Sequence, residues 1–118
     1  MKKTLLLAAL LLSSAAQAET WVCAALDSGN EQTITTFVRQ EGYFAVTHSQ
    51  QGSEDIKINE DILAEDDSLL IVGKFRFGEL GGVEMRMINK VTNQYAVDGV
   101  FLTKGFKVVR HDGSCTKI

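Results

Sequence analysis

The residues best suited to chemistry in this chain are its two histidines, His48 and His111. His48 follows two apolar residues at strand spacing, so its ring points inward or caps a strand end, whereas His111 lies beside a turn and is expected in solvent. No Gly-x-Ser-x-Gly turn, His-Glu-x-x-His pair or phosphate-binding glycine loop accompanies them. Nucleophilic and acid–base catalysis need partner groups in a defined geometry. We therefore predict that the protein is not an enzyme and has no catalytic residue and no cofactor.

The spacing of these residues is also poor for a metal site. Zinc sites usually draw on closely spaced cysteines and histidines, and the Cys-x-x-Cys spacing is absent. Residues 55–59 carry polar groups at alternate positions, as a calcium-binding EF-hand loop does, but a lysine occupies a ligand position and Glu60 the glycine position. We predict no metal, with a looser surface calcium site at Asp61, Asp66 and Asp67 as the alternative.

The first eighteen residues have the order of a secretory signal peptide. Met1-Lys2-Lys3 is cationic, residues 4–12 are apolar, and Ala16-Gln17-Ala18 matches a cleavage site. This apolar run is too short to span a bilayer, which needs ~20 residues, and no later stretch is long enough. We therefore predict a signal peptide at 1–18 and a single periplasmic domain at 19–118.

Export determines how the two cysteines, Cys23 and Cys115, are interpreted. Two cysteines in an oxidising compartment usually pair. A disulfide between them would close nearly the whole domain into one loop, which is worth about 4–5 kcal/mol in chain entropy. A reactive thiol pair and a metal site are the alternatives.

The predicted mature chain has the two-residue periodicity of β-strands. Residues 55–62 and 83–87 alternate apolar with polar side chains. Turn signals such as Glu41-Gly42, Gln51-Gly52 and Asp112-Gly113 recur at roughly the 8–12-residue spacing of all-β folds. Because closure removes exposed strand edges, we predict a small antiparallel β-barrel of about eight strands with its termini tied by the disulfide. A β-sandwich is the alternative.

Charge is unevenly distributed along the chain. The formal net charge of −3 excludes a strongly basic nucleic-acid-binding protein. Between Glu54 and Asp67, seven acidic residues and one lysine give a net charge of −6, and from Lys74 onward the net charge is +4. The acidic segment is either a solvated surface that maintains solubility or an edge that attracts a cationic protein. For the second case we predict Glu60, Asp61, Asp66 and Asp67 as partner-binding residues.

Four short pieces of the sequence resemble one known family. Trp21-Val22-Cys23, Tyr95-Ala96-Val97-Asp98-Gly99, Lys104-Gly105 and Cys115 have the layout seen in the periplasmic C-type lysozyme inhibitors (the MliC/PliC group). The resemblance covers about a third of the chain. It implies a small antiparallel β-barrel with a disulfide between its terminal regions, and inhibition of a lysozyme. Of the family's Ser-Gly-x-x-Tyr motif only Tyr95 is present, since Val91-Thr92 occupy the Ser-Gly positions; Tyr95 therefore joins the predicted partner-binding residues.

Together these features predict a periplasmic, non-enzymatic β domain that binds a protein partner. The most concrete version is an inhibitor or immunity protein whose loops block the cleft of a cationic hydrolase or toxin. No nucleic acid and no membrane insertion are expected, and the sequence carries no signal for an oligomeric state. The alternative is a calycin-like protein that binds a small ligand in an interior cavity, with Phe75, Phe77, Met85, Met87 and Phe101 as its lining.

Overall fold

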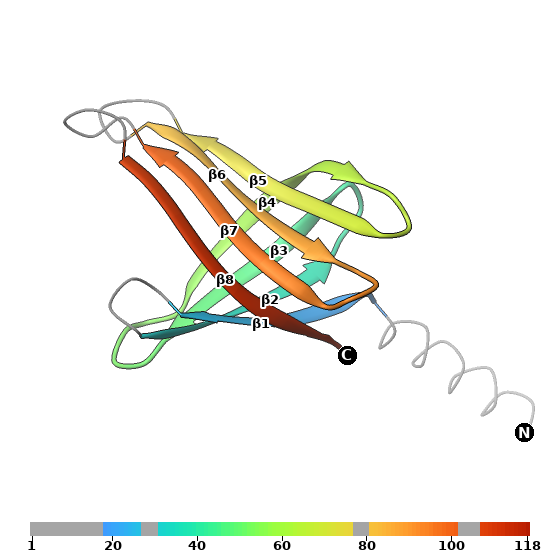
Figure 1. Cartoon of the computed structure of the whole chain (residues 1–118), viewed down its shortest axis with the longest axis horizontal. Helices are drawn as coiled ribbons and strands as arrows, with labels where there is room; N and C mark the ends of the chain where they lie inside the picture. The colour runs from blue at the N-terminus through green and yellow to red at the C-terminus, as the bar shows by residue number, and fades with distance from the viewer. Residues whose placement is uncertain (1–17, 27–30, 77–80, 102–106) are drawn as a thin grey trace, which may run out of the picture.

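The computed structural model describes residues 18–26, 31–76, 81–101 and 107–118 (Figure 1). All regular structure within these ranges is β-strand. The strands are β1 (Thr20–Leu26), β2 (Gln32–Arg39), β3 (Tyr43–Gln50), β4 (Ile56–Glu65), β5 (Leu69–Arg76), β6 (Gly82–Asn89), β7 (Gln94–Phe101) and β8 (Lys107–Lys117). In the described part of the chain, no helix has the length and apolar character needed to span a membrane. The predicted signal peptide lies outside the described residues, apart from Ala18.

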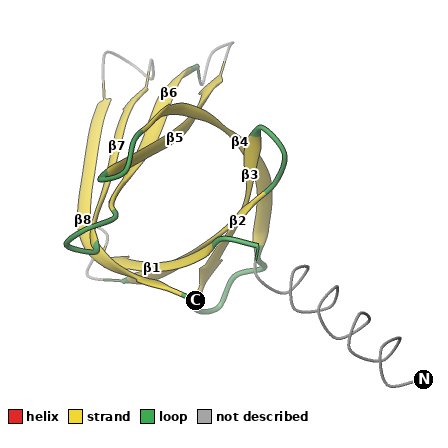
Figure 2. Cartoon of the chain, turned by 90° about the vertical axis from the view of Figure 1, so that its right-hand side faces the viewer, coloured by secondary structure: helices red, strands yellow, loops and turns green. Residues whose placement is uncertain are grey.

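The strands form one closed barrel in chain order (Figure 2). Each strand pairs antiparallel with the next, and β1 pairs with β8 to complete the ring. The register of that last pair places Cys23 opposite Cys115, with their Cα atoms 4.0 Å apart, and the two sulfurs form a disulfide. The predicted all-β barrel with tied terminal regions is therefore confirmed, and the sandwich and the other predicted roles of the cysteines are excluded.

The two ends of the barrel differ in their connections. One end, which we call the tight-turn end, carries the short turns after β2, β4 and β6 together with the start of β1 and the end of β8. Gly42 and Asn93 adopt the left-handed conformation in two of these turns, with φ of 85° and 64°. The other end, which we call the loop end, is where β1, β3, β5 and β7 finish.

The apolar core fills the half of the barrel next to the tight-turn end. In the strands that contribute to it, the inward-facing positions next to the tight-turn end carry large aromatic or branched side chains, and these form the core. They are Trp21, Phe37, Phe44, Leu70, Ile88 and Tyr95, each at most 3% exposed. Burying each is worth about 1.5–3 kcal/mol, so this layer supplies most of the apolar stabilisation.

An ion cluster covers this core at the tight-turn end. Arg39 Nε donates to Glu19 Oε2 at 2.5 Å, and the same guanidinium bonds Glu65, which also accepts from Lys90 Nζ at 2.6 Å. The guanidinium lies 4.7 Å from the centre of the Phe44 ring, a cation–π contact. The cluster therefore joins β2, the β4–β5 hairpin and the residue before β1 over the buried aromatic rings.

Three of the five residues predicted to line an apolar cavity, Phe75, Met85 and Met87, face away from the barrel interior. Phe75 is 60% exposed on the outer face of β5, and Met85 and Met87 alternate with the buried Arg86 and Ile88, which places them on the outer face of β6. Phe101 is half-buried and lies in phase with the inward-facing Tyr95 and Val97, and Phe77 lies outside the described residues. On β5 and β6 the barrel interior is formed by the alternate set of residues.

Candidate functional site

The half of the barrel next to the loop end contains a cavity of about 150 Å³, lined by apolar as well as charged and polar side chains. Most of the residues around it are half-buried, so solvent reaches the site. Six strands (β1, β2, β3, β6, β7 and β8) supply its side chains at inward positions. The lining residues are Ala25, Thr33, Thr35, His48, Glu84, Arg86, Tyr95, Val97, Val109 and His111.

A buried ionic network forms one side of this cavity. Arg86 in β6 donates from Nη1 to Glu60 Oε1 and from Nη2 to Glu84 Oε1. Glu60 is 1% exposed and Arg86 is 7% exposed, so both charges are removed from water. Buried charges persist in folded proteins when they are paired, and removing one partner usually costs about 3–5 kcal/mol. One guanidinium therefore holds two carboxylates in fixed positions inside the barrel.

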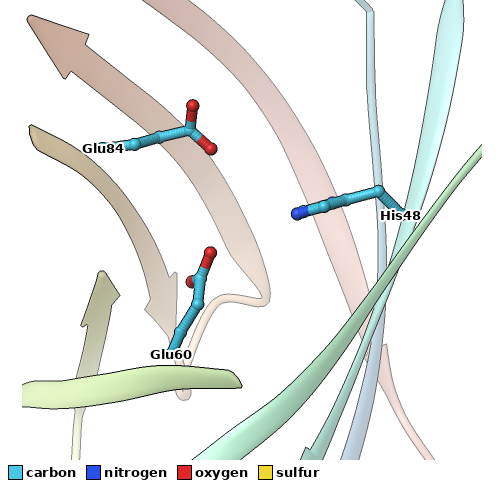
Figure 3. A group of neighbouring side chains, drawn as sticks. All are labelled: His48, Glu60 and Glu84. Atoms are coloured by element: carbon cyan, nitrogen blue, oxygen red, sulfur yellow. The ribbon is translucent and has the colours of Figure 1, made fainter. Parts of the chain in front are cut away.

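His48 faces these carboxylates from β3. Its Nδ1 lies 3.1 Å from Thr35 Oγ1 on the neighbouring strand β2. The donor atoms of His48, Glu60 and Glu84 all lie within 4.8 Å of one another, and Figure 3 shows the imidazole and the two carboxylates converging. The inward orientation expected for His48 from its strand spacing is confirmed.

His111 does not lie in open solvent, as the sequence suggested. It pairs with Val97 in the β7–β8 ladder, is half-buried and lines the cavity. The turn that the prediction assumed near His111 is absent, because β8 continues without interruption to Lys117. Both histidines of the chain therefore contribute to the same site.

Tyr95 is a core residue. It is 3% exposed, and its ring contacts Phe37 edge-on at 6.0 Å between centroids. Burial raises the pKa of the Tyr95 phenol to about 12, although the positive charge of Arg86 opposes the shift. The phenol therefore stays protonated at neutral pH at the base of the cavity, and it is not accessible to a partner protein.

The acidic residues predicted to bind a partner do not form one surface. Glu60 points into the barrel, so its charge is absent from the outer face, whereas Asp61, the next residue in β4, is exposed. Asp66 and Asp67 are exposed in the turn between β4 and β5. Asp66 Oδ1 accepts hydrogen bonds from the backbone of Ser68 and Leu69, and these bonds lower the pKa of its carboxyl. The Asp66 carboxylate therefore stabilises the turn.

The sequence contained a signal for this site that the prediction missed. Glu60 lies in phase with the inward-facing Ile58 and Ile62, and Glu84 and Arg86 lie in phase with Ile88. A charged residue at an inward position of a strand requires an opposite charge or a ligand inside the barrel. The two strands therefore carried complementary charges on their interior faces.

Comparison with known proteins found no match among family models, curated proteins or solved structures. A fold alone does not specify a function, so the function has to be inferred from the geometry and charge of the site.

Proposed function

We propose that this chain is a small-ligand-binding barrel of an exported compartment, with the cavity at the loop end as its binding site. The observation that carries the proposal is the buried Glu60–Arg86–Glu84 network beside that cavity. Charged groups in a partly enclosed pocket, supported by rigid strands, are typical of binding sites.

The size and chemistry of the cavity restrict the ligand. A volume of about 150 Å³ corresponds to roughly five water molecules at ~30 Å³ each, so the ligand has only a few non-hydrogen atoms. The cavity is lined by one carboxylate, one guanidinium and two imidazoles, and the buried Glu60 carboxylate bonds the same guanidinium; these groups favour an ion or a compact polar solute over a lipid. The disulfide is compatible with the oxidising compartment that the leader predicts.

The test is a thermal-shift screen of compact ions and polar solutes, together with native mass spectrometry of protein isolated from its own compartment. A ligand at a hundred times its Kd stabilises the fold by about 2.7 kcal/mol, which raises the Tm by about 10–20 °C in a domain of this size. Glu60→Gln should abolish the shift, and Asp61→Asn, which removes the same charge from the outer face of β4, should retain it. A protein that carries no ligand and responds to none would overturn the proposal.

A second candidate function is docking of a cationic protein, as the resemblance to lysozyme inhibitors implies. It is supported by exposed acidic side chains along β4 and its flanking turns, at Glu54, Asp55, Asp61, Asp66 and Asp67. Charge of one sign on a rigid surface accelerates association with a partner of the opposite sign.

This docking function is tested by association kinetics with a cationic C-type lysozyme as the probe. We expect Asp61→Lys combined with Asp67→Lys to slow association at least about tenfold at low salt, with a smaller effect at high salt. Asp66 is left unchanged because its carboxylate holds the turn. No association with the wild-type chain, or an unchanged rate for the variant, would contradict this function.

A further inference from the structure

The interior cavity brings together three side chains with the donor types of a metal site. His48 comes from β3, Glu60 from β4 and Glu84 from β6, and one donor atom of each lies within 4.8 Å of the other two (Figure 3). The donors of a tetrahedral zinc site, with bonds of about 2.0–2.2 Å, lie about 3.4 Å apart. If the distances between the three donor atoms shortened by roughly an ångström, all three atoms could bind one ion. Rotation of the side chains can supply this change.

The neighbouring residues hold these three side chains in position. Arg86 bonds the Oε1 atoms of both glutamates, and each carboxylate has a second oxygen that can bind a metal. Thr35 Oγ1 lies 3.1 Å from His48 Nδ1. When Nδ1 carries the proton and donates to Thr35, the lone pair needed for coordination is on Nε2. Metal-binding histidines and carboxylates commonly have such outer hydrogen bonds, which set their tautomer and orientation.

The charge of the cluster favours a cation. Two carboxylates and one guanidinium sum to a formal charge of −1 when His48 is neutral. One of the two carboxylates, Glu60, is 1% exposed, so little water screens its charge. A divalent cation would compensate that charge with direct bonds to both carboxylates.

The donor set also selects the kind of metal. Calcium and magnesium favour oxygen ligands, whereas imidazole combined with carboxylates suits zinc and the neighbouring divalent transition metals. The two cysteines are joined in the disulfide and supply no thiolate. Three protein ligands leave a further coordination position, and the cavity provides the space for water or a small solute to occupy it.

We propose that the loop-end cavity binds one divalent transition-metal ion of the zinc class, with His48, Glu60 and Glu84 as its protein ligands. This inference rests on the proposed small-ligand function and names its ligand. The three ligands are separated along the chain and form no sequence motif, because only the closed barrel brings them together.

The experiment is titration of the chelator-treated, disulfide-intact protein with Zn²⁺ by calorimetry and with Co²⁺ by visible absorption. We expect one ion per chain and a cobalt spectrum of low coordination number. His48→Ala and Glu84→Gln should each weaken Zn²⁺ binding at least about tenfold. Asp61→Asn, on the outer face of β4, is the matched control and should leave the affinity within about threefold of the wild type.

The outcomes separate this inference from the proposed function. Absence of Zn²⁺ and Co²⁺ binding to the folded wild-type chain would overturn the metal site, whatever the variants do. If other solutes still stabilise the wild type but not Glu60→Gln, the small-ligand function stands without the metal. The metal site would also be overturned by ¹⁵N NMR of the His48 ring if both ring nitrogens were protonated at neutral pH and Zn²⁺ did not change this. Such a result would show that a protonated His48, and not a metal ion, compensates the negative charge of the two carboxylates.

Discussion

Removal of the Cys23–Cys115 disulfide should lower stability substantially and leave the fold intact. The two residues are 92 positions apart in the sequence, and a loop of that length loses about 16 cal/mol/K on closure, or about 4.6 kcal/mol at 25 °C. The β1–β8 ladder has five paired positions and continues to close the barrel in the native state. The cost therefore arises mainly in the unfolded chain, and it corresponds to a Tm about 20 °C lower for a domain of about 100 residues.

The assay is urea and thermal unfolding followed by circular dichroism, for the wild type with and without reductant and for Cys23→Ala combined with Cys115→Ala. The alanine pair avoids placing hydroxyl groups at two buried positions. The reduced wild type is the matched control, since it keeps both sulfurs and isolates the effect of the cross-link. The urea m-value should rise on reduction because the unfolded chain expands. A loss of less than about 1 kcal/mol with an unchanged m-value would refute the loop-closure argument.

Three further predictions concern packing, charge and pH. Gly113→Ala places a Cβ 1.9 Å from a backbone carbonyl oxygen of β1, so it should cost about 1–3 kcal/mol in urea unfolding, whereas Ser114→Ala, at an exposed position, should cost little. Arg86→Met leaves two interior carboxylates without their guanidinium and should cost about 3–5 kcal/mol at neutral pH in thermal unfolding. The hydrogen bond from Arg39 lowers the pKa of Glu65 below its ordinary value of 4.5. The ion pair therefore contributes its full stability above pH 4.5, and this contribution is lost as the pH falls through the lowered pKa of the folded state. In a series of Tm measurements down to about pH 3, Arg39→Leu should make the decline in Tm with falling pH less steep.

The architecture could be predicted from local signals, because strands and turns are encoded over short stretches. Alternation of apolar and polar residues located the strands, and glycine-containing pairs such as Glu41-Gly42 located several of the turns. The barrel followed from the need to remove strand edges, and the disulfide from the number of cysteines and the expected compartment. These inferences do not require knowledge of which side chains meet across the barrel.

The candidate site could not be predicted in the same way, because it depends on which face of each strand points inward. In β6 the small-ligand alternative assigned Met85 and Met87 to the interior, whereas the interior face is the alternate one, which carries Glu84 and Arg86. A shift of one residue exchanges the two faces of a strand, and hydrophobicity alone favours the apolar set. The partner of Arg86 is Glu60, 26 residues earlier in the chain, and only the closed barrel brings them together.

The distribution of stability within the barrel supports a binding role for its polar half. The buried aromatic layer, the ion cluster around Arg39 and the disulfide all stabilise the half next to the tight-turn end. Apolar residues at positions 60, 84 and 86 would fill the other half, and replacement of buried ion pairs by apolar side chains is often neutral or stabilising by about 1–4 kcal/mol. Stability alone therefore gives little reason to retain charges there. Their convergence with His48 beside a solvent-accessible cavity is accounted for when they bind an ion or a small solute.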